Sequence, residues 1–221
     1  MRKFDTTAPI AAILDIPAGR VQVIAADRAD TTVEVRPMDA SKSRDVKLAE
    51  RTTVDYADGV LRIKAESKTQ ILGSSGFVEV TVQLPAGSRV EAKTASGEFR
   101  GVGRLGDVVF EGAHGPVKLD EAASVRLATQ AGDVTVGRLA GPAEITTAKG
   151  DIRIAEASSG SVVLRTEAGD VSVDAAAGVS ASLDAGTSYG RIHNSLRNAD
   201  GTPALTIQAT TSYGDITARG L

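Results

Sequence analysis

A six-residue word built on threonine and glycine recurs along the second half of the chain, and it limits the possible folds more than any other feature. The word reads Thr-x-x-Gly-acidic-aliphatic, as in TASGEF from Thr94, and GAHGPV from Gly112 is an altered copy. Its central glycines are spaced by 18, 17, 18, 19, 21 and 24 residues and are Gly97, Gly115, Gly132, Gly150, Gly169, Gly190 and Gly214. Self-similarity at such a period is typical of solenoids.

Two short segments in each period alternate apolar with polar residues, which predicts β-strands. One follows the glycine, as with Val134 and Val136, and the other leads to the threonine, as with Val125 and Leu127. Two strands and two corners use up about eighteen residues, so no crossover helix fits and each strand must pair with its counterpart in the next repeat, about 4.8 Å away. The sequence predicts an all-β fold, a parallel single-stranded β-solenoid (a right-handed β-helix) with coils of about 18 residues.

The first third of the chain has a different rhythm. Segments such as RVQVIA and GFVEVTVQL alternate as strands do, but the repeated word is missing from them. We predict that residues 1–84 form an irregular β cap or wider coils, and that residues 85–221 form a solenoid of about seven coils. No polar stretch is long enough to be a linker between domains, so residues 1–221 are predicted to be a single domain.

The seven central glycines are predicted to be structural corners, because a sharp turn with positive φ costs a residue with a Cβ atom about 1 to 2 kcal/mol. Tyr189 and Tyr213 precede two of these glycines and fall in the same position of adjacent coils. Two interpretations stay open, namely a stacked pair that seals a corner and an aromatic platform for a sugar or protein partner. Together with Arg191 they are the candidate partner-binding residues.

Acidic residues follow most of the glycines and form a column, with Asp107 on the opposite side. The members of the column are Glu98, Asp133, Asp151, Asp170 and Asp215. Calcium-binding β-rolls place more glycines around each aspartate than this chain does. We therefore expect each carboxylate to accept backbone hydrogen bonds at its own corner, and Arg191 to interrupt the column. No metal ligand and no cofactor-binding residue is predicted.

The sequence contains no arrangement of residues typical of a catalytic site. His114 and His193 lie several predicted coils apart, so they cannot share a site, and both are expected on the surface. The chain has no nucleophile elbow, phosphate-binding loop or pair of metal ligands at a recognisable spacing. We expect no catalytic residue and no enzymatic activity.

Charge and apolar runs bear on partners and location. The formal net charge is −3 and the charged residues of both signs are interspersed, which argues against nucleic acid as a partner. The apolar run near the N-terminus contains Asp15 and is too short for a signal-peptide core. No stretch approaches the ~18 apolar residues of a membrane span. These features predict a cytoplasmic protein.

The Thr-x-x-Gly-Asp-Val words, the Pro-Ala-Gly-Ser step at Pro85 and the aliphatic alternation resemble the bacterial β-strand-repeat family called "putative adhesin". The resemblance covers essentially the whole chain, and bactofilins are similar in coil length only. It implies a single-stranded β-helix and supplies no catalytic residues.

The sequence therefore predicts a non-enzymatic scaffold or binding module for an unknown protein or glycan partner. Two alternatives stay open, a self-assembling structural protein and a glycan-binding or glycan-cleaving β-helix. The C-terminal coil, with Leu205, Ile207, Ile216 and Ala218, is predicted to be the last of the stack, with strand edges that need a cover. We expect the insertion 194–203 to cover it, and association between copies through this coil is the alternative.

Overall fold

The computed structural model describes residues 1–66, 76–198 and 201–221, and the chain divides into two compact units, 1–115 and 116–221. Nearly all regular structure in both units is β-strand, which confirms the predicted all-β class. The single-domain organisation stays a prediction, and each unit is described by itself.

Unit 1, residues 1–115, is a mixed sheet with one helix. Its elements are β1 (Arg2–Asp5), β2 (Ala11–Asp15), β3 (Ala18–Ala26), β4 (Asp30–Pro37), α1 (Ser43–Arg51), β5 (Thr52–Ala57), β6 (Val60–Ala65), β7 (Val78–Pro85) and β8 (Arg89–His114). β2 pairs in parallel with β6 and β8, and β3 pairs in parallel with β7 and β8. The β1–β4, β4–β7 and β5–β6 pairs are antiparallel.

Helix α1 is a feature that strand alternation does not predict. Its sequence SRDVKLAER contains good helix formers such as Leu, Ala, Lys and Arg, and Leu48 is buried. Asp45 is also buried, and its Oδ1 accepts the backbone N–H of Phe77 at 3.0 Å. A buried apolar side chain and a buried carboxylate therefore both anchor the helix.

One corner of unit 1 extends the glycine column beyond the seven predicted members. Gly19 on β3 lies opposite Gly97 on β8, in the same register that pairs Val21 with Phe99. Gly19 has a φ of 135°, a backbone conformation that residues with a Cβ rarely adopt. The repeated word does not extend to Gly19, because no threonine stands three residues before it.

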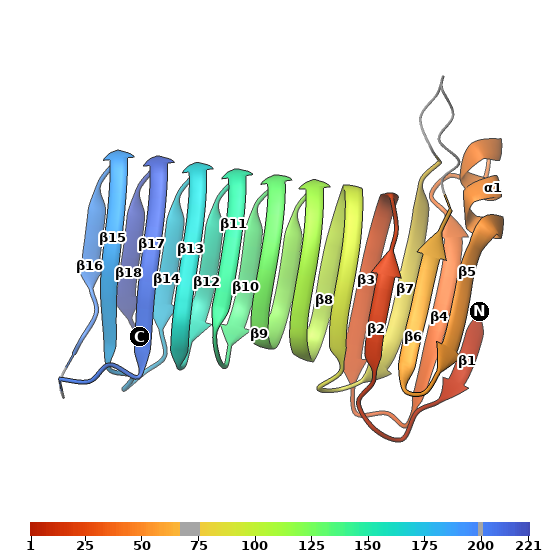
Figure 1. Cartoon of the computed structure of the whole chain (residues 1–221), viewed down its shortest axis with the longest axis horizontal. Coiled ribbons are helices and arrows are strands. Elements are labelled where there is room, and N and C mark those ends of the chain that lie inside the picture. The colour runs from red at the N-terminus through yellow and green to blue at the C-terminus, as the bar shows by residue number, and fades with distance from the viewer. Residues whose placement is uncertain (67–75, 199–200) are drawn as a thin grey trace. The chain divides into compact units, whose positions relative to one another are not determined.

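Unit 2, residues 116–221, is a stack of strand pairs joined only by parallel pairing among its described residues. Its strands are β9 (Val117–Ala131), β10 (Val134–Leu139), β11 (Ala143–Lys149), β12 (Ile152–Ala157), β13 (Gly160–Ala168), β14 (Val171–Ala175), β15 (Ala181–Tyr189), β16 (Ile192–Ser195), β17 (Leu205–Tyr213) and β18 (Ile216–Gly220). Val134 lies opposite Val117 on one side and Ile152 on the other, and all three are buried. This in-register stacking confirms the predicted parallel pairing between repeats (Figure 1).

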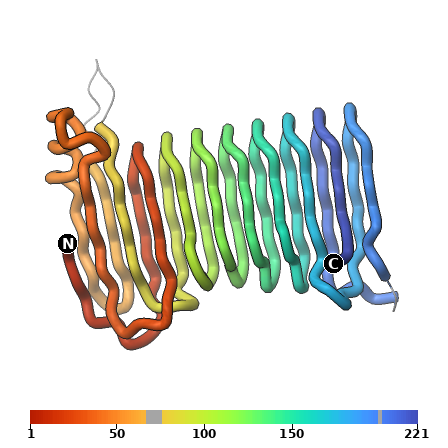
Figure 2. The backbone as a smooth tube through the Cα atoms, turned by 180° about the vertical axis from the view of Figure 1, so that it is seen from behind, coloured from red at the N-terminus to blue at the C-terminus, as the bar shows by residue number. Residues whose placement is uncertain are grey.

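The last strands of unit 2 do not follow the order of the sequence. β17 pairs with β13 on one side and with β15 on the other, and β18 likewise pairs with β14 and with β16. Residues 205–220, the inner coil, thus lie between β13–β14 and residues 181–195, the edge coil. Figure 2 shows the dark blue C-terminal strands inside the lighter blue ones.

The prediction that the C-terminal coil ends the stack is therefore wrong, and the insertion 194–203 has no open C-terminal coil to cover. Leu205, Ile207, Ile216 and Ala218 are buried between two other coils, with at most 1% of their surface exposed. The open position belongs to the edge coil. The physical reason is Asn194, which occupies the core column opposite Ala218, where an amide could not be satisfied if another coil covered it. The insertion 194–203, of which residues 199 and 200 lie outside the described part of the chain, stands in the sequence between the edge coil and the inner coil.

Candidate functional site

The two tyrosines of the repeated TSYG word form a stacked pair. Tyr189 on the edge coil lies opposite Tyr213 on the inner coil, with ring centroids 5.0 Å apart and an interplanar angle of 4°. The side chains remain 68% and 61% exposed, respectively. The pair therefore has the stacked geometry expected of two rings that seal a corner. It is also accessible enough to serve as an aromatic platform for a partner.

Thr166, Thr187 and Thr211 each donate to a corner glycine of the neighbouring coil, whereas the hydroxyl of Thr147 donates within its own coil. The hydroxyl of Thr211 donates to the carbonyl oxygen of Gly169 at 3.0 Å, and the hydroxyl of Thr187 donates to that of Gly214 at 3.0 Å. A Cβ atom on Gly214 would lie 2.0 Å from the oxygen of Gly169, and one on Gly190 would lie 1.9 Å from the oxygen of Gly214. Only glycine permits this close approach.

Positive φ applies to some of the predicted corners but not to all. Values from 130° to 153° occur at Gly115, Gly132, Gly150, Gly169 and Gly214. The φ angles of Gly97 and Gly190 are not positive. Glycine is nevertheless required at position 97, because a Cβ atom there would lie 2.0 Å from the carbonyl oxygen of Gly19. Close backbone approach is thus the more general reason for glycine here.

The aspartates of unit 2 form a ladder between coils. Oδ1 of Asp133 accepts the backbone N–H of Asp151 at 3.0 Å, Oδ1 of Asp151 accepts that of Asp170 at 2.8 Å, and Oδ1 of Asp170 accepts that of Asp215 at 2.8 Å. Each carboxylate therefore accepts the backbone amide of the next coil. The sequence predicted instead that it would accept amides of its own corner. No cluster of three or more metal-ligating side chains occurs among the described residues.

Arg191 ends this ladder at the edge coil. Its backbone N–H donates to Oδ1 of Asp215 at 2.9 Å, and its guanidinium donates to Oδ2 of the same carboxylate at 2.9 Å. These two hydrogen bonds from Arg191 hold the pKa of Asp215 below its usual value. The Arg191 side chain is 87% exposed, so it carries an accessible positive charge beside the tyrosine pair.

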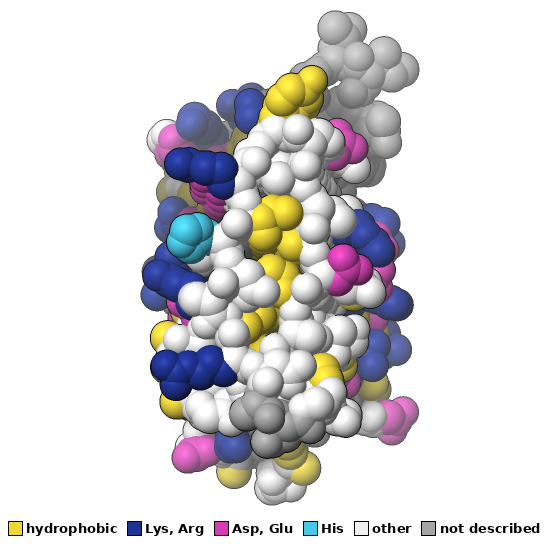
Figure 3. Space-filling view, turned by 90° about the vertical axis from the view of Figure 1, so that its left-hand side faces the viewer, with side chains coloured by type: hydrophobic (Ala, Val, Ile, Leu, Met, Phe, Trp, Pro, Cys, Tyr) yellow, Lys and Arg dark blue, Asp and Glu magenta, His cyan; other side chains and the backbone are white. Residues whose placement is uncertain are grey.

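The edge coil has an open side. β15 pairs with β17 and β16 pairs with β18, and within the described ranges no further strand pairs with either. Ile192 is 46% exposed, whereas Ile216 opposite it is 1% exposed. Figure 3 shows this end of unit 2 as a central band of apolar side chains flanked by charged ones. The open side is thus an apolar surface along unpaired strands.

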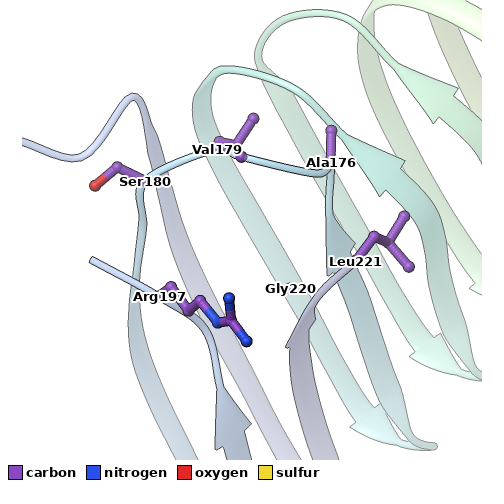
Figure 4. A pocket seen from close by; sticks show the side chains of 7 residues that line it. Ala176, Val179, Ser180, Arg197, Gly220 and Leu221 are labelled. Carbon is purple, nitrogen blue, oxygen red and sulfur yellow. The ribbon is translucent and has the colours of Figure 1, made fainter. Parts of the chain in front are cut away.

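The remaining candidates do not join the tyrosine pair. His114 ends β8 in unit 1 and His193 lies on β16 in unit 2, and both are exposed. A surface pocket of about 160 Å³ opens at the other corner of unit 2 (Figure 4) and is lined by Ala176, Gly178, Val179, Ser180, Arg197, Gly220 and Leu221. Arg197 is the only residue of its lining with an ionisable side chain. Among the described helices, none has the length and apolar character to cross a bilayer.

Comparison with solved structures shows shared architecture at low identity. A structure described as a putative adhesin from Bacteroides fragilis is 13% identical, covers 98% of this chain and 95% of its own, and has a TM-score of 0.50. A putative cell adhesion protein from Clostridium sporogenes is 12% identical over 100% and 99%, with a TM-score of 0.41. A putative lipid binding protein from Parabacteroides distasonis is 12% identical over 98% and 95%, with a TM-score of 0.44.

No curated protein matches the chain. The model of one family does match, and it is described as Toastrack DUF4097. The match runs over residues 14–220, which includes the glycine corners, the aspartate ladder and both tyrosines. The chain belongs to the Toastrack DUF4097 family.

Proposed function

We propose that this protein is a non-enzymatic β-solenoid scaffold that binds a partner through the open side of the edge coil. The observation that carries the proposal is the exposed Tyr189–Tyr213 stack beside the exposed guanidinium of Arg191. Aromatic residues and arginine are enriched where proteins bind their partners, since both contribute large contact areas and directed polar contacts. The partner is a protein or a glycan, and the cytoplasmic location stays a prediction.

A binding panel tests this proposal. The wild-type protein and the Tyr189→Ser/Tyr213→Ser variant are compared on immobilised oligosaccharides and on extended peptides of varied charge. At least one class of ligand should bind the wild type and lose most of its signal with the variant. The thermal melts of both proteins serve as the control for folding. If every ligand that binds does so equally to both proteins, the tyrosine pair is not the contact surface.

Self-assembly through the edge coil is a second candidate, because unpaired strands can pair with those of another copy. The observation in its favour is the open side of β15 and β16. Arg191 weighs against it, since an arginine at this position supplies no carboxylate to accept the amide of an added coil. Sedimentation from micromolar to near-millimolar concentration distinguishes the two candidate functions. The sedimenting species should become larger with concentration only if the protein self-assembles.

A further inference from the structure

The contacts between the inner and edge coils show how this end of unit 2 recognises a strand. The inner coil contributes an aromatic ring for Tyr189, a carbonyl oxygen for the hydroxyl of Thr187 and a carboxylate for Arg191. All three contacts involve one face of the edge coil. The opposite face of the same coil is open, so its unused groups define what could bind there.

Three groups on the open side repeat the pattern of the covered side. The carbonyl of Gly190 occupies the position at which the carbonyls of Gly150, Gly169 and Gly214 each accept a threonine hydroxyl from the next coil. Tyr189 is 68% exposed although one face of its ring stacks on Tyr213. The guanidinium of Arg191 uses one N–H group on Asp215, and guanidinium has five donors.

The guanidinium of Arg191 favours a ligand that carries a carboxylate. Its side chain is 87% exposed at the corner between β15 and β16, and Asp184 on β15 is the exposed acid of the edge coil. Ile192, 46% exposed, and the half-buried Leu183 add apolar surface between the charged groups. Unpaired backbone groups beside apolar side chains are the setting for strand addition, in which an extended peptide extends a sheet.

We propose that the open side of the edge coil binds an extended segment of a partner polypeptide as a parallel strand alongside β15. The segment carries alternating apolar residues, a hydroxyl residue for Gly190, an aromatic residue for Tyr189 and a following carboxylate for Arg191. This inference rests on the proposed function and specifies the partner as a polypeptide. A sugar would satisfy Tyr189 and Arg191 but would leave the backbone groups of β15 unpaired.

A synthetic peptide with the sequence of residues 204–220 is the probe. Within the chain this segment stacks Tyr213 on Tyr189 and binds Arg191 through Asp215. Its Thr211 donates to the equivalent corner carbonyl of Gly169. The peptide is titrated into the full-length protein by calorimetry, with a scrambled peptide as the control. The intact sequence should bind and the scrambled one should not. Tyr189→Ser should weaken binding by roughly twofold to tenfold, the size expected for the loss of an aromatic pair.

A charge exchange tests the arginine contact. Arg191→Glu in the protein should weaken binding of the original peptide, and the peptide substitution Asp215→Lys should restore part of it. Arg126→Glu is the matched control, since Arg126 is 75% exposed and pairs with Glu144 on another face of unit 2. If Arg191→Glu unfolds the edge coil, Tyr189→Ser, whose fold is checked by its thermal melt, decides the question.

Hydrogen exchange distinguishes addition from replacement. Bound peptide should increase the protection of amides in the edge coil, residues 181–195, and leave the protection of residues 205–220 unchanged. Loss of protection in residues 205–220 would mean that the peptide displaces the inner coil, which overturns the inference. The inference is also overturned if the peptide does not bind, or if the Tyr189→Ser and Arg191→Glu variants bind it as tightly as the wild type does. If an oligosaccharide then binds at the tyrosines, the proposed function stands while the polypeptide partner is excluded.

Discussion

The inner and edge coils of unit 2 carry the same TSYG word and the same strand lengths up to the corner, yet they occupy different places in the stack. The inner coil presents Ile216 and Ala218 to the core, and the edge coil presents Ile192 and Asn194 in the same columns. The inner coil carries Asp215 in the ladder, and the edge coil carries Arg191. The difference teaches which of two similar coils can lie inside a stack. The inner position goes to the coil whose core residues tolerate burial between two neighbours.

Corner glycines should show the largest difference between the two coils. Gly214→Val should destabilise the protein by about 2 to 5 kcal/mol, because it combines a φ of 150° with a Cβ 2.0 Å from the oxygen of Gly169. Gly190→Val should cost about 1 to 3 kcal/mol, since the edge coil can move outward and its φ is not positive. Urea unfolding at 25 °C measures both. Equal losses would show that the edge coil is as tightly held as the inner one.

Polar substitution in the shared core column tests why the coils are ordered as they are. Ala218→Asn should cost about 1 to 3 kcal/mol, because the amide would be buried between two coils without partners. Asn194→Ala should cost less than about 1 kcal/mol, since it removes only the hydrogen bond from the backbone N–H of Leu196 to Oδ1 of Asn194. Chemical denaturation again provides the free energies of unfolding. A tolerated Ala218→Asn would contradict our explanation of why residues 205–220, and not residues 181–195, lie between two coils.

The tyrosine stack should link the two coils by a modest coupling. Tyr189→Leu and Tyr213→Leu each remove the same ring contact, so the double variant should be less destabilised than the sum of the single ones. The expected coupling in a double-mutant cycle is about 0.5 to 1.5 kcal/mol. Strictly additive losses would mean that the rings lie side by side without stabilising each other.

The contact between Asp215 and Arg191 should give the smallest effect, visible in the pH dependence of stability. Hydrogen bonds from Arg191 lower the pKa of Asp215 in the folded protein. The stabilisation is therefore present above the unfolded pKa of about 3.9 and is lost as the pH falls through the lower folded value. Asp215→Asn should remove this part of the acid dependence, as measured by thermal melts between neutral and acid pH. An unchanged profile would indicate that solvent screens the contact.

Much of unit 2 could be predicted from the sequence because each coil repeats the same local solution. The spacing of Thr, Gly and aliphatic residues predicts the parallel columns, and the shared word predicts that Tyr189 lies next to Tyr213. The order of the last two coils could not be predicted from periodicity, because residues 181–195 and residues 205–220 both match the repeat equally well. Asn194 in a core column and Arg191 in the acidic column were the signals that one coil belongs at the edge.

Unit 1 was less predictable for a different reason. Its strands combine parallel and antiparallel pairs, and the contacts that fix them join residues far apart in the sequence, such as Arg20 with Glu98 at 3.0 Å. The helix from Ser43 depends on a buried carboxylate, Asp45, whose amide partner at Phe77 lies 32 residues away. Such pairings have no local pattern, so alternation alone assigns strands without assigning their neighbours.

The insertion of the inner coil also sets a condition on how the chain reaches its final arrangement. Residues 181–195 leave the ribosome before residues 205–220, so the edge coil exists before the coil that separates it from β13 and β14. Growth of the stack in the order of synthesis would place the edge coil directly against β13. The edge coil must stay loose, or detach, until the inner coil has entered. Until then β13 offers an unpaired strand to other unfinished chains, which exposes this step to misassembly.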